Sequence, residues 1–123
     1  LTLTYVGSKK TTPNYNVMGV AKAALETSVK YLSVDLGKNN IRVNAISAGP
    51  MKTIAGAAIS GARHVYRYSE KIAPLQKNPD LEQVGNAALY LLSDISSGVT
   101  GLTHYVDGGL KVVGIPNQDM VNI

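Results

Sequence analysis

Short strand-like segments that alternate with long helical stretches constrain the fold of this chain more than any other feature. The strand-like segments are Leu1 to Tyr5, Ile41 to Ser47 and Thr103 to Val106, and all contain β-branched residues or apolar residues. Each intervening stretch is long enough for a crossover helix, and such crossovers join parallel neighbours in a sheet. The order predicts an α/β fold with about three parallel strands and flanking helices. Because parallel sheets are usually wider, the chain is expected to be one part of a larger domain.

Two helices are predicted between the strands from the spacing of apolar residues and from start and stop signals. The first runs from Asn14 to Leu36, with Pro13 before it and Gly37 after it. Its apolar stripe consists of Val17, Ala21, Leu25, Val29, Leu32 and Leu36. The second covers Val84 to Leu92 and follows the start signals Pro79, Asp80, Glu82 and Gln83. Residues 51–72 are expected to form a mobile helical flap, and residues 110–123 a loose tail.

Composition excludes several classes of protein. The 123 residues carry a formal charge of +4 that is spread along the chain, so no basic stripe suggests nucleic-acid binding. No apolar run reaches the roughly 20 residues of a membrane-spanning helix, and no signal peptide is recognisable. The absence of cysteine excludes disulfides and thiolate catalysis and agrees with a cytoplasmic protein. Residues 1–123 are therefore expected to form a single partial domain without nucleic-acid or membrane partners.

Tyr15 and Lys22 are the first candidates for chemistry. Seven residues fall about 20° short of two helical turns, so both side chains lie on one side of the first helix, about 10 Å apart along its axis. A phenol and an ammonium group in an apolar stripe need polar partners or must extend to solvent. A ligand with hydroxyl groups would be such a partner. The spacing alone also fits a Tyr15 that packs at the helix start and a Lys22 that reaches solvent.

A wider set of motifs narrows these interpretations. The strings YNVMGVAKAALE and IRVNAISAGP, followed by QVGNAALYLLSD, SSGVTG and YVDGG, extend over nearly the whole chain. Together they resemble the enoyl-acyl carrier protein reductases, a divergent branch of the short-chain dehydrogenase/reductases. Most members of that superfamily have the tyrosine four residues before the lysine, where this chain has Met18, and follow the next strand with Pro-Gly, where it has Ala48, Gly49 and Pro50. Both departures favour the enoyl reductase branch, and the resemblance implies the C-terminal half of a doubly wound, Rossmann-like parallel-sheet fold.

The resemblance also implies a reaction: reduction of trans-2-enoyl thioesters on acyl carrier protein, the last reductive step of bacterial-type fatty acid elongation. Hydride comes from a nicotinamide cofactor, NADH or alternatively NADPH, and negative charge develops on the thioester oxygen. The family's catalytic pattern of two tyrosines and a lysine maps onto Tyr5, Tyr15 and Lys22. Tyr15 would donate to the developing oxyanion, and Lys22 would hold the nicotinamide ribose. Tyr5 would act beside the substrate as an acid or base, or serve only as a packing residue.

The same resemblance assigns further residues to the cofactor and the substrate. The cofactor set, besides Lys22, is Gly49, Pro50, Met51, Lys52, Thr53, Ile54 and Ala55. The substrate set is Tyr5, Tyr15, Met18 and Ile59. Many relatives carry an aromatic residue in a DFR motif of the flap, where this chain has Gly61, Ala62 and Arg63. The sequence therefore does not determine how the flap contacts the acyl chain. His64 and His104 stand alone in the sequence, so no metal site is expected.

A dinucleotide site normally includes an element that this sequence lacks. No glycine-rich fingerprint follows a strand, so the adenine half of the cofactor is expected to bind an N-terminal half of the fold. Two alternatives stay open. A ketoacyl reductase would need a serine thirteen residues before the tyrosine, where this chain has Thr2. A non-catalytic fragment would act in oligomer assembly, since the family is often homotetrameric. Its contact stripe on the first helix would be Ala21, Ala24, Leu25, Ser28, Leu32 and Leu36.

Overall fold

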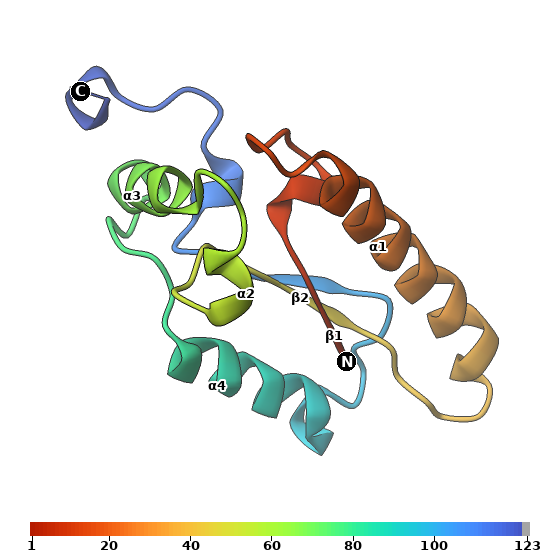
Figure 1. Cartoon of the computed structure of the whole chain (residues 1–123). Coiled ribbons are helices and arrows are strands. Elements are labelled where there is room, and N and C mark those ends of the chain that lie inside the picture. Colours follow the sequence, from red (N-terminus) through yellow and green to blue (C-terminus); the bar gives the residue numbers. More distant parts are fainter. Residues whose placement is uncertain (122–123) are drawn as a thin grey trace.

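A parallel three-stranded sheet forms the centre of the computed structural model, which describes residues 1–121 (Figure 1). The strands are β1 (Thr2–Thr4), β2 (Ala45–Ala48) and β3 (Thr103–Val106). They pair in the order β1-β2-β3, and both pairs are parallel. The predicted α/β class and three parallel strands are therefore confirmed. Strand β3 has its predicted bounds, whereas β1 is one residue shorter at each end than predicted.

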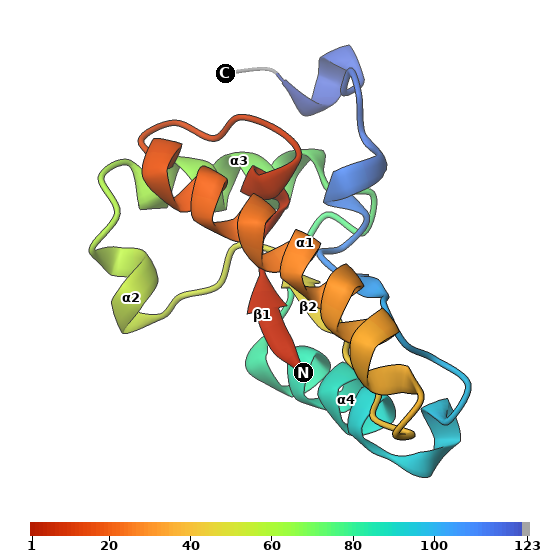
Figure 2. The ribbon, with the colours of Figure 1, turned by 90° about the vertical axis from the view of Figure 1, so that its right-hand side faces the viewer.

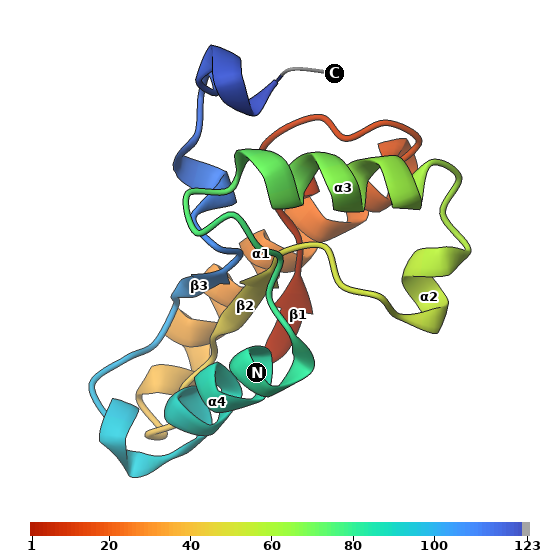
Figure 3. The same ribbon diagram turned by 90° about the vertical axis from the view of Figure 1, so that its left-hand side faces the viewer.

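Helices α1 and α4 cover opposite faces of the sheet. Helix α1 lies in front of the strands in Figure 2, whereas α4 lies in front of them in Figure 3. Ile46 and Ala48 of β2 point towards α4 and form a buried apolar cluster with Val84 and Leu91. Because side chains alternate along a strand, Ser47 faces α1. The helices are α1 (Asn16–Gly37), α2 (Ile54–Ala57), α3 (Ala62–Ile72) and α4 (Leu81–Leu92).

Strand β2 begins four residues later than predicted, because the backbone of Val43 and the side chain of Asn44 bond to the loop that precedes β3. The Val43 N–H donates to the Thr100 hydroxyl at 3.0 Å, and the Val43 carbonyl accepts from the Gly101 N–H at 2.8 Å. The side chain of Asn44 bonds to the same loop. Of the segment 41–47, only Asn44 to Ser47 is buried, whereas Ile41 is 48% exposed. The residues before β2 are held by a loop that lies far away in the sequence.

Helix α1 begins at Asn16, two residues later than predicted. Asn14 has a φ of 60°, in the left-handed region that ends regular helix. Tyr15 is the cap residue, and its carbonyl accepts from the Gly19 N–H. The side chain of Tyr15 is thus fixed at the point where the chain enters the helix.

The sequence predicted the wrong side of α1 to be buried. Of its members only Val29 is fully buried, whereas Val17 is 82% exposed. The side of α1 that faces the sheet carries Gly19, Lys22 and Glu26 beside Val29. These polar residues are tolerated there because backbone and hydroxyl groups bond to them. The large apolar side chains that α1 exposes are Val17, Met18, Val20, Tyr31, Leu32 and Val34. A role of the exposed face in assembly stays a prediction.

Helix α4 starts where the sequence signals placed a helix start, three residues before the predicted Val84. Asp80 accepts from the Gln83 N–H at 2.8 Å, and the Gln83 side chain accepts from the Asp80 N–H at 3.1 Å. This reciprocal capping box satisfies two backbone donors at the helix start. Within residues 1–121, none of the helices is both long and apolar enough to cross a membrane.

The predicted flap is helical, since residues 51–72 include α2 and α3, which lie beyond the carboxyl ends of the strands (Figure 3). The prediction of a loose tail is wrong for its first residues. Lys10 donates to the carbonyls of Lys111 and Val113, at 2.8 Å each. Asp107 accepts from the Lys111 N–H at 2.9 Å. Residues 122–123 of the predicted tail lie outside the described residues.

Arg42 links the residues before β2 to the C-terminal end of α4. Its guanidinium donates to the Leu91 carbonyl and the Ser96 hydroxyl at 2.9 Å, and to the Ser93 carbonyl at 3.1 Å. Carbonyls at a helix end have no partner within the helix. A single side chain therefore satisfies several acceptors. These acceptors lie at the amino-terminal ends of the strands, away from the carboxyl ends.

We expect Arg42→Met to lower the free energy of unfolding of the whole protein by about 2 to 4 kcal/mol, because buried acceptors lose a charged donor. Urea unfolding of the wild type and the variant measures this difference. Arg63→Met is the matched control, since Arg63 is exposed on α3, and its effect should stay below about 0.5 kcal/mol. Equal effects of the two substitutions would contradict the assigned role of Arg42.

Candidate functional site

The carboxyl edge of the sheet brings several candidate residues to one side of the fold. Parallel strands end at the same edge, and open α/β sheets bind their ligands there. Tyr5 follows β1, Gly49 follows β2 and Asp107 follows β3. The turn after β1 also leads to the start of α1, so Tyr15 belongs to this edge too.

Tyr5 and Tyr15 contact each other at this edge. Their ring centroids lie 5.2 Å apart, and the planes meet at 71° in an edge-to-face arrangement. The Tyr15 side chain is buried and that of Tyr5 is partly buried. Such aromatic pairs gain about 0.5 to 1.5 kcal/mol beyond the burial of area. The two predicted catalytic tyrosines are thus brought together, ten residues apart in the chain.

Two glycines let the tyrosine pair and α1 approach the turn after β1. A β-carbon at Gly7 would lie 2.6 Å from Cδ1 of Tyr15 and 3.1 Å from Cδ1 of Tyr5. A β-carbon at Gly19 would lie 2.9 Å from the Gly7 carbonyl oxygen. The Tyr15 ring therefore rests directly on the backbone of Gly7. The sequence interpretation did not single out these glycines.

Both phenols are protonated at neutral pH, and burial favours this neutral form further. Burial raises the pKa of the Tyr15 phenol above its ordinary value of 10.0. The pKa of the Tyr5 phenol is also raised, because burial and the neighbouring Tyr15 outweigh the lowering effect of the Thr12 side chain. Each hydroxyl can thus act as a hydrogen-bond donor where negative charge develops.

Lys22 bonds to β1 and does not simply extend to solvent. Its half-buried side chain donates from Nζ to the Leu3 carbonyl at 2.9 Å. An ammonium group has three donors, so further N–H groups can bond to a ligand. Lys22 lies on α1 downstream of Tyr15, and its partner Leu3 lies two residues before Tyr5. One strand and one helix therefore position all three predicted catalytic residues.

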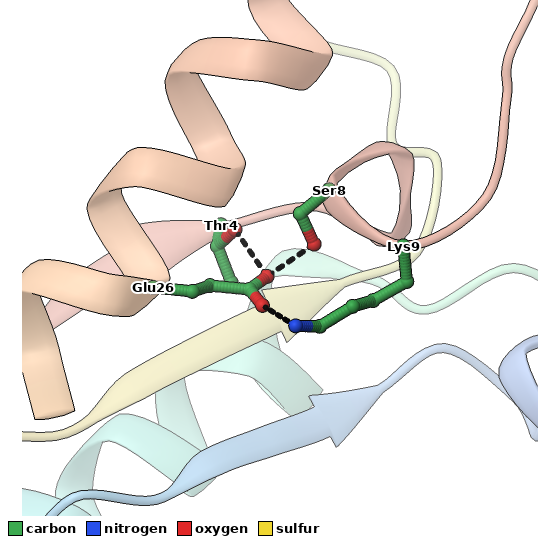
Figure 4. A network of polar contacts seen from close by, with 4 residues as sticks. All are labelled: Thr4, Ser8, Lys9 and Glu26. Carbon is green, nitrogen blue, oxygen red and sulfur yellow. Dashed lines mark hydrogen bonds and ion pairs between the residues drawn. The ribbon is translucent and has the colours of Figure 1, made fainter.

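The sequence interpretation missed a buried carboxylate next to these residues, that of Glu26 (Figure 4). Glu26 of α1 is only 2% exposed. The Thr4 hydroxyl donates to its Oε1 at 2.8 Å, and the Ser8 hydroxyl donates to the same oxygen. Lys9 Nζ lies 3.1 Å from Oε2. Glu26 lies four residues after Lys22, on the same side of a helix. This spacing is the sequence signal that could have indicated Glu26 as part of the site.

Glu26 is ionised at neutral pH despite its burial. Burial by itself raises the pKa of this carboxyl group, but the hydrogen bonds from Ser8, Thr4 and Lys9 and the charge of Lys9 lower it by more. The net pKa therefore lies below the ordinary value of 4.5. A buried charge of this kind is stable only while its partners stay in place.

The segment assigned to the cofactor follows β2 along the same edge. Gly49 is buried, and a β-carbon there would lie 2.9 Å from Pro79. Thr53 caps α2, because its hydroxyl oxygen accepts from the Gly56 N–H at 3.0 Å. Among residues 1–121, the hydroxyl hydrogen stays available to donate to a ligand. Ile54 is 95% exposed. The remaining members of this set are Pro50, Met51, Lys52 and Ala55, and Met51 packs against the buried apolar cluster.

The flap is tied to the tyrosine pair through the residue before Tyr15. Asn14 donates from its side-chain amide to the Ser60 carbonyl at 3.0 Å. Ile59, assigned to the substrate, precedes this contact and is partly buried, whereas Met18 on α1 is 44% exposed. Both residues therefore lie on segments that start or end near Tyr15.

The histidines contact aromatic rings. His64 stacks on Tyr68 at 6.3 Å between centroids, and His104 lies 6.4 Å from Tyr90. Among residues 1–121, no three side chains of His, Cys, Asp or Glu lie together in a way that could hold a metal ion.

The donors at the carboxyl edge fit one half of a nicotinamide dinucleotide. Ribose hydroxyls and phosphate oxygens accept hydrogen bonds, and Lys22 and Thr53 offer free donors of suitable type. No glycine-rich turn in this sequence could hold the other half.

Comparison with known proteins assigns the chain to a family. The family model described as enoyl-(acyl carrier protein) reductase matches residues 1–111. Enoyl-acyl-carrier-protein reductase (NADH) 1 of Rhizobium meliloti is 58% identical over all 123 residues, which are 45% of that protein. The corresponding NADH enzyme FabI of Rickettsia typhi is 60% identical over 93% of this chain and 44% of its own length. The chain thus spans less than half the length of these relatives.

Solved structures agree with this assignment. The crystal structure of FabI from Candidatus Liberibacter asiaticus is 55% identical and superimposes with a TM-score of 0.90, over 94% of this chain and 45% of that one. The reductase from Anaplasma phagocytophilum, solved in complex with NAD, is 56% identical with a TM-score of 0.88, over 94% of this chain and 44% of that one. In sequence and in fold, this chain belongs to the enoyl-(acyl carrier protein) reductase family.

Proposed function

We propose that the whole protein reduces trans-2-enoyl thioesters of acyl carrier protein with NADH, and that this chain supplies the catalytic side chains. The relatives are named as NADH enzymes of this kind, and one similar structure contains NAD. The observation that carries the proposal is the buried, protonated Tyr15 phenol beside Tyr5, on the same helix as Lys22.

Tyr15 is proposed to donate its hydroxyl hydrogen to the thioester oxygen of the substrate. Negative charge develops on this oxygen when the β-carbon of the enoyl group accepts a hydride, and a positioned donor stabilises that charge. The raised pKa keeps the donor protonated before the reaction. The ring cannot shift towards the turn after β1, because the Gly7 backbone lies directly against it.

Lys22 is proposed to hold the nicotinamide ribose. The cofactor, when bound, supplies the hydride. The Leu3 carbonyl fixes one ammonium donor of Lys22, so the remaining donors have a restricted range of directions. The positive charge also favours an anionic transition state in a site from which water is excluded.

Tyr5 is proposed to line the substrate site as a second phenol. Its edge-to-face contact with Tyr15 places its ring next to the proposed donor. Thr53 and the backbone after Gly49 are proposed to bond to the pyrophosphate of the cofactor, since the hydroxyl hydrogen of Thr53 is free. Met18 and Ile59 are proposed to contact the acyl chain from α1 and from the flap.

The ketoacyl reductase alternative is less well supported. Thr2, which replaces the serine of such enzymes, lies at the amino-terminal start of β1. Three residues of extended chain, about 10 Å, separate it from Tyr5. A hydroxyl at that end of the strand lies away from the edge where the tyrosine pair is located.

We expect the whole protein to reduce trans-2-enoyl thioesters faster than 3-ketoacyl thioesters of equal chain length, because the site offers two phenols and the chain has Thr2 at the position of the ketoacyl reductase serine. The rate of NADH oxidation with each substrate measures this preference. Faster reduction of the ketoacyl thioester would refute the proposed reaction while leaving the membership of the family intact.

We expect Tyr15→Phe to lower kcat by about 100-fold or more, since a donor to a developing oxyanion is typically worth that much. The KM for NADH should change little, because the ring and its packing are retained. Steady-state kinetics with an enoyl thioester test this. Tyr31→Phe is the matched control, because Tyr31 is 71% exposed on the same helix. A Tyr15→Phe enzyme with unchanged kcat would show that another group donates.

We expect Lys22→Ala to weaken NADH binding by about 10- to 100-fold, which corresponds to the loss of one hydrogen bond from a charged donor. Calorimetric titration of the whole protein with NADH measures the affinity. Lys30→Ala removes an exposed lysine of α1 and should leave the affinity unchanged. If both variants bound NADH like the wild type, the assigned role of Lys22 would be incorrect.

A further inference from the structure

Glu26 bonds to residues on both sides of Tyr5. Thr4 precedes Tyr5 directly, and Ser8 follows it by three residues. Both hydroxyls donate to the same oxygen of Glu26, and Lys9 pairs with the other oxygen (Figure 4). The carboxylate therefore joins the two ends of the short segment 4–8 to α1.

Segment 4–8 carries one tyrosine and supports the other. Tyr5 belongs to the segment itself, and the Tyr15 ring rests on the backbone of Gly7 within it. Any movement of the segment away from α1 would open the space under the Tyr15 ring and change the edge-to-face contact. The directions of both hydroxyls thus depend on how firmly the segment is held.

The carboxylate holds the segment more strictly than a neutral group would. A buried charge is costly unless every one of its oxygen atoms has donors, and charge-assisted hydrogen bonds are about twice as strong as neutral ones. Displacing Thr4 or Ser8 would leave Glu26 with an incompletely paired charge at 2% exposure. Glutamine would fill the same volume, but it would lose the charge that attracts Lys9.

We propose that Glu26 is a positioning residue that fixes the Tyr5 and Tyr15 hydroxyls by holding segment 4–8 against α1. Its effect on turnover rests on the proposed reductase function, whereas its effect on the two rings does not. Glu26 acts on the rings through Thr4, Ser8 and the backbone of Gly7.

Ser47 provides a matched control within the same layer. It pairs with Thr4 in the parallel register, and its side chain is 1% exposed. Among residues 1–121, its hydroxyl has no hydrogen-bond partner. Ser47→Ala therefore changes a buried hydroxyl next to Thr4 without removing any bond to Glu26.

The test compares E26Q with Ser47→Ala in the whole protein, by kinetics and by NMR of tyrosines labelled in the ring. The Tyr5→Phe and Tyr15→Phe variants assign the two ring signals. We expect E26Q to shift or broaden both signals and to lower kcat at least about tenfold, because small misplacements of reacting groups cost that much or more. The KM for NADH should stay within about twofold, since Lys22 keeps its contact with Leu3. Ser47→Ala should change neither the signals nor kcat.

Unchanged ring signals and unchanged kcat in folded E26Q would overturn the proposal, as would equal losses in E26Q and Ser47→Ala. If E26Q does not fold, Thr4→Val and Thr4→Ser decide the question. The serine variant retains the hydroxyl, so both ring signals and kcat should match those of the wild type. The valine variant lacks the hydroxyl, so its ring signals should shift or broaden and its kcat should fall. Equal behaviour of the two variants would overturn the proposal.

If the wild type fails to reduce enoyl thioesters, the reductase function is refuted, and the ring signals alone then decide the role of Glu26.

Discussion

Gly19 of α1 approaches the carbonyl of Gly7 so closely that a β-carbon at Gly19 would lie 2.9 Å from that oxygen. This contact sets the distance between α1 and the turn after β1. Residues 19, 22, 26 and 29 lie on one side of a helix by their spacing, so the same approach brings Lys22 to the Leu3 carbonyl and Glu26 to the Thr4 hydroxyl. The tyrosine pair depends on it as well, because the Tyr15 ring lies on Gly7.

The two faces of the sheet are buried by different kinds of contact. Towards α4, Ile46 and Ala48 pack with Val84 and Leu91, and the free energy comes from removing apolar area from water. Towards α1, charged side chains reach backbone and hydroxyl groups. Apolar packing tolerates small shifts, whereas hydrogen bonds to a buried charge are directional and leave a large penalty when broken. The face that carries the proposed chemistry is therefore the one held by directional bonds.

The proposed proton-donor chemistry depends on the same packing. Burial raises the pKa of the Tyr15 and Tyr5 phenols, which favours their neutral, donating form. The nearby carboxylate stays charged because Thr4, Ser8 and Lys9 supply three donors to it (Figure 4). The environment thus shifts the pKa values in opposite directions: burial raises those of the two phenols, and hydrogen bonds with the charge of Lys9 lower that of the carboxyl group.

Several features were determined by the sequence through local signals. The parallel sheet follows from short strands joined by long crossovers, and the start of α4 follows from Asp80 and Gln83, which bond within four residues of each other. The existence of α1 and the presence of Tyr15 and Lys22 on it were also predictable, because helical spacing is a local property. Motif resemblance assigned Tyr5 and Tyr15 to one catalytic set, and the structure shows in addition that their rings are in contact.

Other features were decided only by the tertiary structure, because their partners lie far away in the chain. Periodicity of apolar residues gave α1 the wrong buried side, since Glu26 finds its donors 18 and 22 residues earlier and no local pattern shows this. Strand β2 starts late because Val43 bonds to Thr100, 57 residues away. The sequence by itself thus determined the three strands, α1 and α4, and it indicated Tyr5, Tyr15 and Lys22 as candidate site residues. Tertiary contacts decided which side of α1 is buried and how the phenols are held, because a buried polar group is stable only where distant residues supply its partners.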